Sequence, residues 1–208
     1  MTYIENIFIC LTAPMIVGAI CVGHKYCRAF IFVICGYVVC LLSAYINTFF
    51  AQLYSADAVI AAVEITPVIE EILKILPLIF YMLVFEPKKE EVLLALFTIV
   101  VSFATFENVC YITENGASNV VYLLIRGFAT GSMHVVCGTI VGYGLIYFSK
   151  FHFLKFAGII GMLSASITYH AIYNLLVSTS GAIQVFGYIF PIATVIIAVT
   201  ARKIYKVS

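Results

Sequence analysis

Seven long apolar segments occupy most of the 208-residue sequence and constrain its fold more than any other feature. Their approximate bounds are 5–22, 29–50, 59–85, 91–112, 120–148, 155–178 and 182–201. A helix of about 20 apolar residues crosses a hydrocarbon layer of about 30 Å. Hydrophobic residues make up 64% of the chain and charged residues 10%, which leaves too few polar side chains to coat a soluble globule. The sequence therefore predicts a polytopic membrane protein.

The segments favour helices over the strands of a β-barrel, because a helix satisfies its own backbone hydrogen bonds in lipid and a barrel strand is short and alternating. No repeat or long linker interrupts the chain, so we expect residues 1–208 to form one all-α domain, a transmembrane bundle of about seven helices. The first segment lacks the basic leader of a cleaved signal peptide and is expected to remain as a helix. The seven cysteines show no C-x-x-C spacing and are expected to be apolar packing residues.

Basic residues fall in alternate loops, which predicts the orientation in the membrane. Nine of the eleven lie on one predicted side: Lys25, Arg28, Lys88, Lys89, Lys150, Lys155, Arg202, Lys203 and Lys206. Because positive charge is retained in the cytoplasm, we expect the N-terminus outside and the C-terminus inside, with the protein spanning the cell membrane and in contact with the lipid bilayer. A net charge of +1 gives no case for nucleic-acid binding.

Ionisable side chains lie inside four of the apolar segments. They are Glu70, Glu71 and Lys74 in the third, Glu107 in the fourth, Arg126 and His134 in the fifth, and His170 in the sixth. An ionisable residue at bilayer depth is costly and is a functional-site hypothesis by default. Their distribution over four helices predicts one shared site.

The third segment combines two adjacent carboxylates with a lysine. Lys74 follows Glu70 by four residues and Glu71 by three, so it can pair with either carboxylate on one helix face. Pro67 lies one turn earlier and lacks a backbone N–H, so it is expected to kink the helix and to free a carbonyl for polar groups or water. The alternative is an ion pair that only locks two helices together.

The fifth segment places Arg126, Thr130 and His134 at four-residue spacing on one stripe. Small residues run beside that stripe: Gly127, Gly131, Gly138 and Gly142. Because small residues let a neighbouring helix approach closely, this face is expected to turn into the bundle. The alternative for His134 is a satisfied hydrogen bond between helices.

The fourth and sixth segments add polar groups near their outer ends. Glu107 and Asn108 are expected about 8 Å below the outer boundary at a rise of 1.5 Å per residue, where a glutamate can extend to water and act structurally. Ser166, His170 and Asn174 share one face of the sixth segment. A histidine and an amide so placed can exchange a proton and donate to an oxyanion.

The residues that carry a family resemblance occur in this order: Glu70-Glu71-x-x-Lys74, Phe103-x-x-x-Glu107-Asn108, Arg126 with His134 and Gly142-Tyr143, and His170-x-x-x-Asn174. Over about residues 64 to 175, this succession resembles the PrsW family of intramembrane proteases. That family is similar to the group of CAAX prenyl endopeptidases and bacteriocin-processing proteins, although Phe128 lies six residues before His134 and departs from that group's Phe-x-x-x-His motif. The resemblance implies cleavage of a single-pass membrane protein near its extracytoplasmic face, such as first-site cleavage of an anti-sigma factor.

We expect hydrolysis by an activated water. Glu70 or Glu71 is the predicted base and His134 or Glu107 positions the water. His170 and Asn174 stabilise the oxyanion, and supporting roles fall to a further set of polar residues: Lys74, Arg126 and Asn108.

No cofactor is expected, because the sequence has no His-Glu-x-x-His motif and two cations would oppose a metal nearby. Zinc is the alternative, since histidine and carboxylate side chains are its usual ligands in catalytic sites. A rival to hydrolysis is a non-enzymatic membrane protein, either a proton-coupled transporter or a bacteriocin-immunity type, in which the same groups relay protons or bind a ligand.

Overall fold

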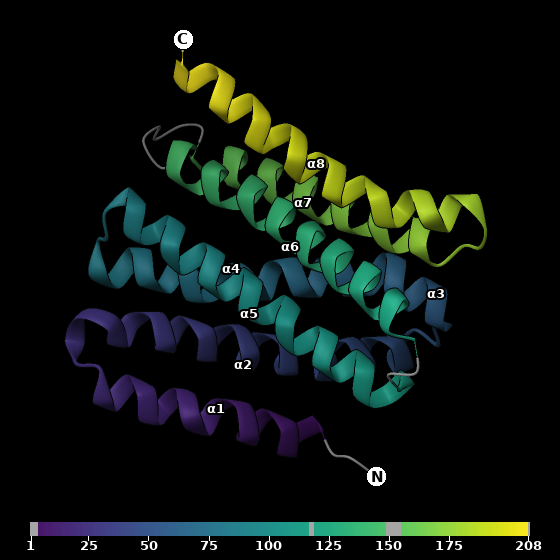
Figure 1. The fold of residues 1–208 in the computed structure, drawn as a ribbon, viewed down its shortest axis with the longest axis horizontal. Helices are drawn as coiled ribbons and strands as arrows, with labels where there is room; N and C mark the ends of the chain where they lie inside the picture. The colour runs from purple at the N-terminus through teal and green to yellow at the C-terminus, as the bar shows by residue number, and fades with distance from the viewer. Residues whose placement is uncertain (1–3, 117–118, 149–154, 208) are drawn as a thin grey trace.

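The protein is described here by a computed structural model that covers residues 4–116, 119–148 and 155–207 (Figure 1). Its elements are α1 (Ile4–Cys21), α2 (His24–Leu53), α3 (Ala58–Ile60), the π-helical turn η1 (Ala61–Ile65), α4 (Thr66–Phe85), α5 (Lys89–Asn115), α6 (Val120–Phe148), α7 (Lys155–Val177) and α8 (Ala182–Val207). α3, η1 and α4 follow one another without a break and correspond to the third predicted segment. The prediction of an all-α bundle is confirmed for the described residues.

The helices run back and forth along the long axis of the molecule (Figure 1). The starts of α2 and α5 and the end of α8, which carry basic residues, lie at the same end of the bundle (Figure 1). This grouping agrees with the alternation of charged loops, although Lys150 lies outside the described residues. Which end faces the cytoplasm remains a prediction.

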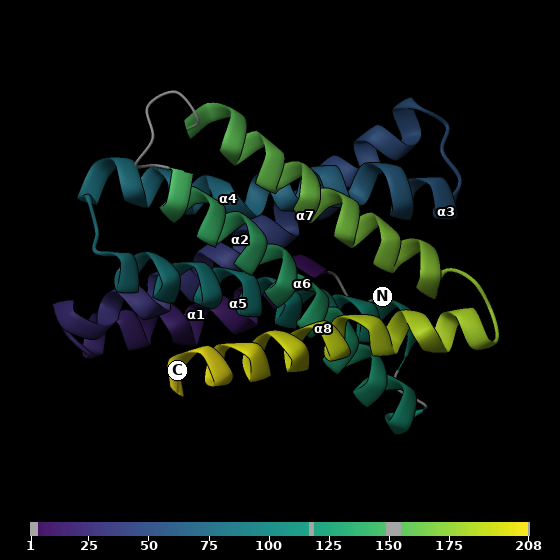
Figure 2. The same cartoon turned by 90° about the horizontal axis from the view of Figure 1, so that it is seen from above.

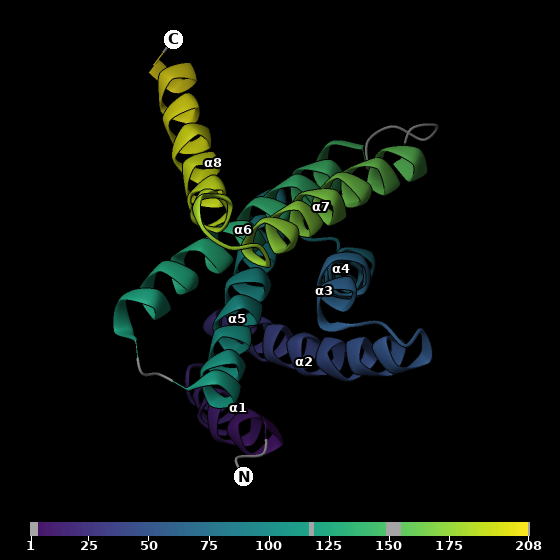
Figure 3. The ribbon, with the colours of Figure 1, turned by 90° about the vertical axis from the view of Figure 1, so that its right-hand side faces the viewer.

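Six helices among the described residues are long and apolar enough to cross a membrane: α1, α2, α5, α6, α7 and α8. α4 has 20 residues but carries three ionisable side chains, so its composition alone does not mark it as a span. It contacts α2, α5, α6 and α7, and it runs beside α7 in Figure 2. α1 and α8 lie at opposite edges of the bundle (Figure 3). α4 is therefore an inner helix, consistent with about seven helices in the membrane.

The two faces of α4 reverse the pattern of a soluble amphipathic helix. Its buried face carries Glu70, Glu71 and Lys74. Its exposed face carries large apolar side chains, among them Leu76 at 50% and Phe80 at 62% exposure. Because lipid is apolar, this arrangement directs the hydrocarbon side chains outward and holds the charged groups between helices. The fold of α4 thus places the site in the bundle interior.

Glycines allow α5 to lie close to its two neighbours. A Cβ atom on Gly138 would lie 2.7 Å from Val100 Cγ2, and one on Gly142 would lie 2.1 Å from Leu96 Cδ2. The close approach predicted for the glycine stripe is therefore confirmed at these two positions. It is absent at Gly131, where no described atom would lie within 4 Å of an added Cβ.

The tightest approach occurs at Gly36 of α2, which was not part of the predicted stripe. An added Cβ there would lie 1.9 Å from Ser102 Oγ and 2.5 Å from the Ile99 carbonyl oxygen. A backbone atom cannot rotate away, so we expect Gly36→Ala to lower the free energy of unfolding by about 1–3 kcal/mol. The matched control is Gly131→Ala, which should leave stability unchanged or raise it by up to about 1 kcal/mol through helix propensity. The melting temperatures in one detergent check this pair, and equal losses in both variants would contradict it.

Candidate active site

Seven ionisable side chains from α4, α5, α6 and α7 form one continuous chain of contacts inside the bundle. In spatial order they are Arg126, Glu107, His134, Lys74, Glu71, His170 and Glu70. The last five have relative exposures between 0 and 6%. The structure thus brings together the ionisable residues that the sequence singled out, while their catalytic roles remain predictions.

Among the seven ionisable side chains, Glu71 accepts the most hydrogen bonds. Its Oε1 accepts hydrogen bonds from Lys74 Nζ at 2.5 Å and from His170 Nδ1 at 2.8 Å. Its Oε2 accepts from the hydroxyl of Ser166 at 2.9 Å. Three donors satisfy this buried carboxylate, which is the condition under which a buried charge is tolerated. Glu71 is therefore placed to orient its neighbours.

Glu70 differs from Glu71 although the two are adjacent. Its Oε2 is buried and has no hydrogen-bond partner among the described residues. The nearest ionic partner is His170 Nε2, at 4.0 Å. His170 Nδ1 contacts Glu71, so a neutral ring that donates from Nδ1 has the lone pair of its Nε2 on the side of Glu70. The site therefore places one unpaired carboxylate oxygen opposite an imidazole nitrogen.

His134 lies between Lys74 and Glu107. Its Nδ1 is 2.8 Å from Lys74 Nζ and its Nε2 is 2.5 Å from Glu107 Oε2. A lysine ammonium only donates, so Nδ1 accepts and the Nε2–H of His134 donates to Glu107. The rings of His134 and Phe103 form an edge-to-face pair, and Lys74 Nζ lies 4.7 Å from the centroid of the Phe103 ring. Phe103 is one of the residues that carry the family resemblance, and its contact with the ammonium could not be seen from the spacing alone.

Glu107 joins His134 to Arg126. α5 ends at Asn115, so Glu107 is about 12 Å from the helix end, and its depth below the membrane boundary stays a prediction. One carboxylate oxygen contacts His134 Nε2, and Arg126 Nη2 lies 3.6 Å from the other oxygen. Arg126 also donates to Asn108 Oδ1 and stacks 3.6 Å above the ring of Tyr111. Asn108 therefore positions the arginine and does not touch the buried carboxylates.

Asn174 supports the backbone just before the two glutamates. Its Nδ2 donates to the Ala62 carbonyl at 2.7 Å, inside the π-helical turn η1. In a π-helix each carbonyl accepts from the N–H five residues later, and Pro67, five residues after Ala62, has no N–H. The carbonyl that the proline was predicted to free is thus satisfied by Asn174. One of the two N–H groups of the Asn174 amide is therefore used in this structural hydrogen bond.

Three hydroxyl groups in the site region were not assigned a role from sequence: those of Ser166, Thr130 and Tyr173. Ser166 was placed on the same face as His170, but the spacing could not show that its hydroxyl donates to Glu71. Thr130 Oγ1 and the hydroxyl of Tyr173 are 2.9 Å apart, and this hydrogen bond joins α6 to α7 near the site. The four-residue spacing of Arg126, Thr130 and His134 indicated that Thr130 faces the bundle interior, whereas no sequence pattern marked Tyr173.

Comparison with known proteins identifies the family. A family model described as PrsW family intramembrane metalloprotease matches residues 24–200. The chain belongs to this family. No curated protein and no solved structure matches the chain. As a PrsW family member with six candidate spans, the protein is an intramembrane protease and a multi-pass integral membrane protein.

The family description implies a metal ion, and the polar cluster contains side chains of the kinds that bind zinc. Ligand atoms of Glu70, His134 and His170 lie within 4.8 Å of one another. Two imidazoles and one carboxylate are a donor set of zinc hydrolases, and Glu71 and Glu107 contact the imidazoles as orienting carboxylates do around zinc. The unpaired Glu70 Oε2 is a further point of fit. One contact opposes it, because Lys74 occupies His134 Nδ1.

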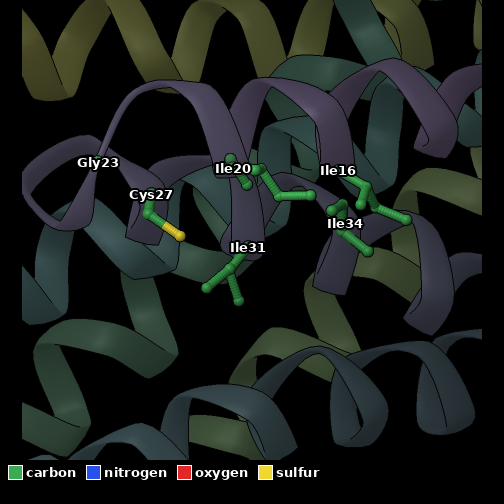
Figure 4. A pocket seen from close by; sticks show the side chains of 7 residues that line it. Ile16, Ile20, Gly23, Cys27, Ile31 and Ile34 are labelled. Atoms are coloured by element: carbon green, nitrogen blue, oxygen red, sulfur yellow. The ribbon is translucent and has the colours of Figure 1, made fainter.

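The charges and the pockets both favour the cluster of Glu70, His134 and His170 as the position of a bound metal ion. Three carboxyl groups in the chain of contacts face two fixed cations, Lys74 and Arg126, so a divalent cation would add positive charge where acidic groups outnumber basic ones. An apolar pocket of about 400 Å³ lies between α1 and α2 (Figure 4). Its labelled side chains include Ile16, Ile20 and Ile31, and its lining contains no carboxylate or imidazole. Among the described residues, the polar cluster and not this pocket contains the groups that acid–base or metal chemistry needs.

Proposed function

We propose that this PrsW protein is an endopeptidase in which Glu70 activates a water molecule for attack on a peptide bond. The observation that carries the proposal is the unpaired, buried Glu70 Oε2 opposite the lone pair of His170 Nε2. A buried oxygen without a partner is costly in a structural residue, whereas a general base needs a free oxygen. Of the two glutamates that the sequence left open, Glu70 is the better base and Glu71 the better support.

The separation of 4.0 Å between Glu70 Oε2 and His170 Nε2 suits one bridging water. Such a water donates one hydrogen to the carboxylate and the other to the imidazole, so its lone pairs stay available for the carbonyl carbon. Glu71 holds His170 in the tautomer that this requires. In the proposed reaction Glu70 takes the proton of the attacking water and then delivers it to the leaving amine.

The oxyanion needs a hydrogen-bond donor on the other side of the carbonyl. Asn174 uses one N–H for the Ala62 carbonyl, and its amide has a second N–H to donate. Arg126 and Lys74 fix the charges of Glu107 and Glu71. No covalent intermediate with the enzyme is required, since the hydroxyl of Ser166 donates to a carboxylate and has no histidine base in the contacts described.

Zinc is the second candidate form of the mechanism, supported by the family description and the donor set. Glu70, His134 and His170 would hold the ion, and Glu70 would then act as a metal ligand and not as the free base. When bound, zinc would polarise the scissile carbonyl and favour ionisation of its water. Glu71 and Glu107 would then act as the carboxylates that orient the two imidazoles.

We propose a single-pass membrane protein as the substrate, cut near its extracytoplasmic face, with an anti-sigma factor as one such partner. The basis is the position of the site in the half of the bundle assigned to the outside by the loop charges. Glu107 and Arg126 lie about 12 Å and about 9 Å from helix ends at that side. A peptide bond just outside a substrate's own span would reach this depth.

A proteomic comparison tests the proposal. Ectodomains of membrane proteins released by cells that carry the wild-type protein should be missing from cells that carry His170→Ala at an equal protein level. Glu64→Gln is the control, because Glu64 is exposed in η1 and should leave release unchanged. Unchanged release with His170→Ala, together with an altered proton flux, would favour the transporter rival. A shed protein found in this way, tagged on its ectodomain, then serves as the reporter substrate.

A further inference from the structure

A cavity of about 210 Å³ reaches the proposed base and is lined by three members of the site, Glu70, Glu107 and Arg126. It lies between α1, α2, α4, α5 and α6. Its polar lining comes from Ser43, Asn47, Glu70, Glu107, Glu114 and Arg126. α2 contributed nothing to the site predicted from sequence, so its two polar side chains here are new.

The lining residues form a path from the helix ends to Glu70. Glu114 is one residue from the end of α5, at about 2 Å depth, and Asn47 is six residues from the end of α2, at about 9 Å. Glu70 is twelve residues from the start of α3, at about 18 Å. All these helix ends lie at the same end of the bundle (Figure 1). The cavity therefore runs inward with Glu70 near its floor.

Two buried oxygens without partners belong to residues that line this cavity. Asn47 Oδ1 and Glu70 Oε2 are the buried side-chain oxygens that have no hydrogen-bond partner in the described part of the chain. An unpaired polar atom in a dry interior costs about 1–3 kcal/mol. A polar cavity needs only about 10–15 Å³ to hold one water, so this one has room for several. Both oxygens are closed off in the structure, so a small movement of each side chain would bring its oxygen to water in the cavity, and water is the smallest partner that would satisfy it.

We propose that this cavity is the hydrated route by which water reaches Glu70, and that Asn47 is a positioning residue on the route. The proposal rests on the proposed function, because it supplies the water that Glu70 activates. Asn47 lies about halfway down the path, where its amide can both donate to and accept from a water chain. A peptide bond that enters the site among the helices would then meet water arriving from a separate direction.

Two natural cysteines allow water itself to be the probe. Cys40 lines the cavity and has 5% exposure, whereas Cys137 has 0% exposure and packs with Met133 and Tyr173 away from it. Hydroxyl radicals made from water by X-ray pulses oxidise thiols that touch water, and mass spectrometry locates the product. If the cavity is hydrated, Cys40 in the purified wild-type protein should be oxidised about tenfold faster than Cys137. Equal, slow oxidation of both thiols would overturn the proposal and requires no variant.

The role of Asn47 is tested by Asn47→Leu, which keeps the size of the side chain and removes its hydrogen bonds. Oxidation of Cys40 should slow several-fold, and kcat on the reporter substrate should fall about tenfold with KM unchanged. Gln52→Leu, an exposed change nearer the end of α2, should alter neither. Unchanged oxidation and kcat in Asn47→Leu would remove Asn47 from the route. Because labelling does not depend on cleavage, an inactive protein with rapidly oxidised Cys40 would count against hydrolysis and still support the hydrated route.

Discussion

Glu70→Gln is expected to lower kcat on the reporter substrate by about three orders of magnitude while the protein stays folded. Glutamine has the same shape as glutamate but cannot take a proton from water. Glu70 Oε2 has no hydrogen-bond partner among the described residues, so the substitution breaks no bond at that atom. The melting temperature should therefore stay about the same, since no hydrogen bond at that oxygen is lost. Cleavage rate and melting temperature, measured on the same preparation, check both parts.

Glu71→Gln provides the contrast that separates the two adjacent carboxylates. Glu71 is bonded to Lys74, His170 and Ser166, so its substitution leaves a buried lysine without its counter-charge. We expect a lower melting temperature and a smaller loss of rate, about tenfold to a hundredfold, typical of a residue that orients another. A larger loss of rate in Glu71→Gln than in Glu70→Gln, in protein that is still folded, would exchange the two assigned roles. Glu64→Gln should behave as wild type in both measurements.

The helices and the convergence of the polar residues were predictable because lipid leaves a strong sequence signal. Each apolar segment became a helical segment within a few residues of its predicted bounds. Lys74 lies one turn from Glu71 by helical periodicity alone, and the ion pair between them needs no other helix. The glycines of the fifth segment predicted a close neighbour, which packing confirmed at Gly138 and Gly142.

Pairings between helices were not predictable, because depth estimates from sequence carry the error of each helix end. α5, for example, continues to Asn115, about one turn beyond the predicted end of its apolar run, so a depth counted from that run differs from one counted from the helix end. Glu70 and Glu71 differ in their hydrogen bonds because Ser166 and His170 of α7 bond only to Glu71 among the described contacts. The spacing of residues within the third segment cannot reveal these partners. Asn47 gave no signal, because one asparagine in an apolar run has no periodic partner to mark its face.

Removal of metal has the second largest expected effect. If zinc is held by Glu70, His134 and His170, a chelator should lower cleavage at least about a hundredfold, and added zinc should restore it. Elemental analysis of the purified protein should find about one zinc per chain in wild type and in Glu64→Gln, and much less in Glu70→Gln and His170→Ala. Active protein that contains no metal and resists the chelator would return the mechanism to a metal-free glutamate base.

The number of imidazoles bound to the metal would show whether His134 leaves Lys74 to become a ligand. Lys74 Nζ lies 2.8 Å from His134 Nδ1, so His134 can bind a metal through that atom only if the ammonium moves away. His170 needs no such change, because its Nε2 is already unpaired on the side of Glu70. X-ray absorption at the zinc edge counts bound imidazoles, and two are expected when His134 has exchanged Lys74 for the metal. One imidazole would mean that Lys74 stays in contact with His134 Nδ1. His134 would then bond only to Lys74 and Glu107, and the metal would be bound by Glu70 and His170.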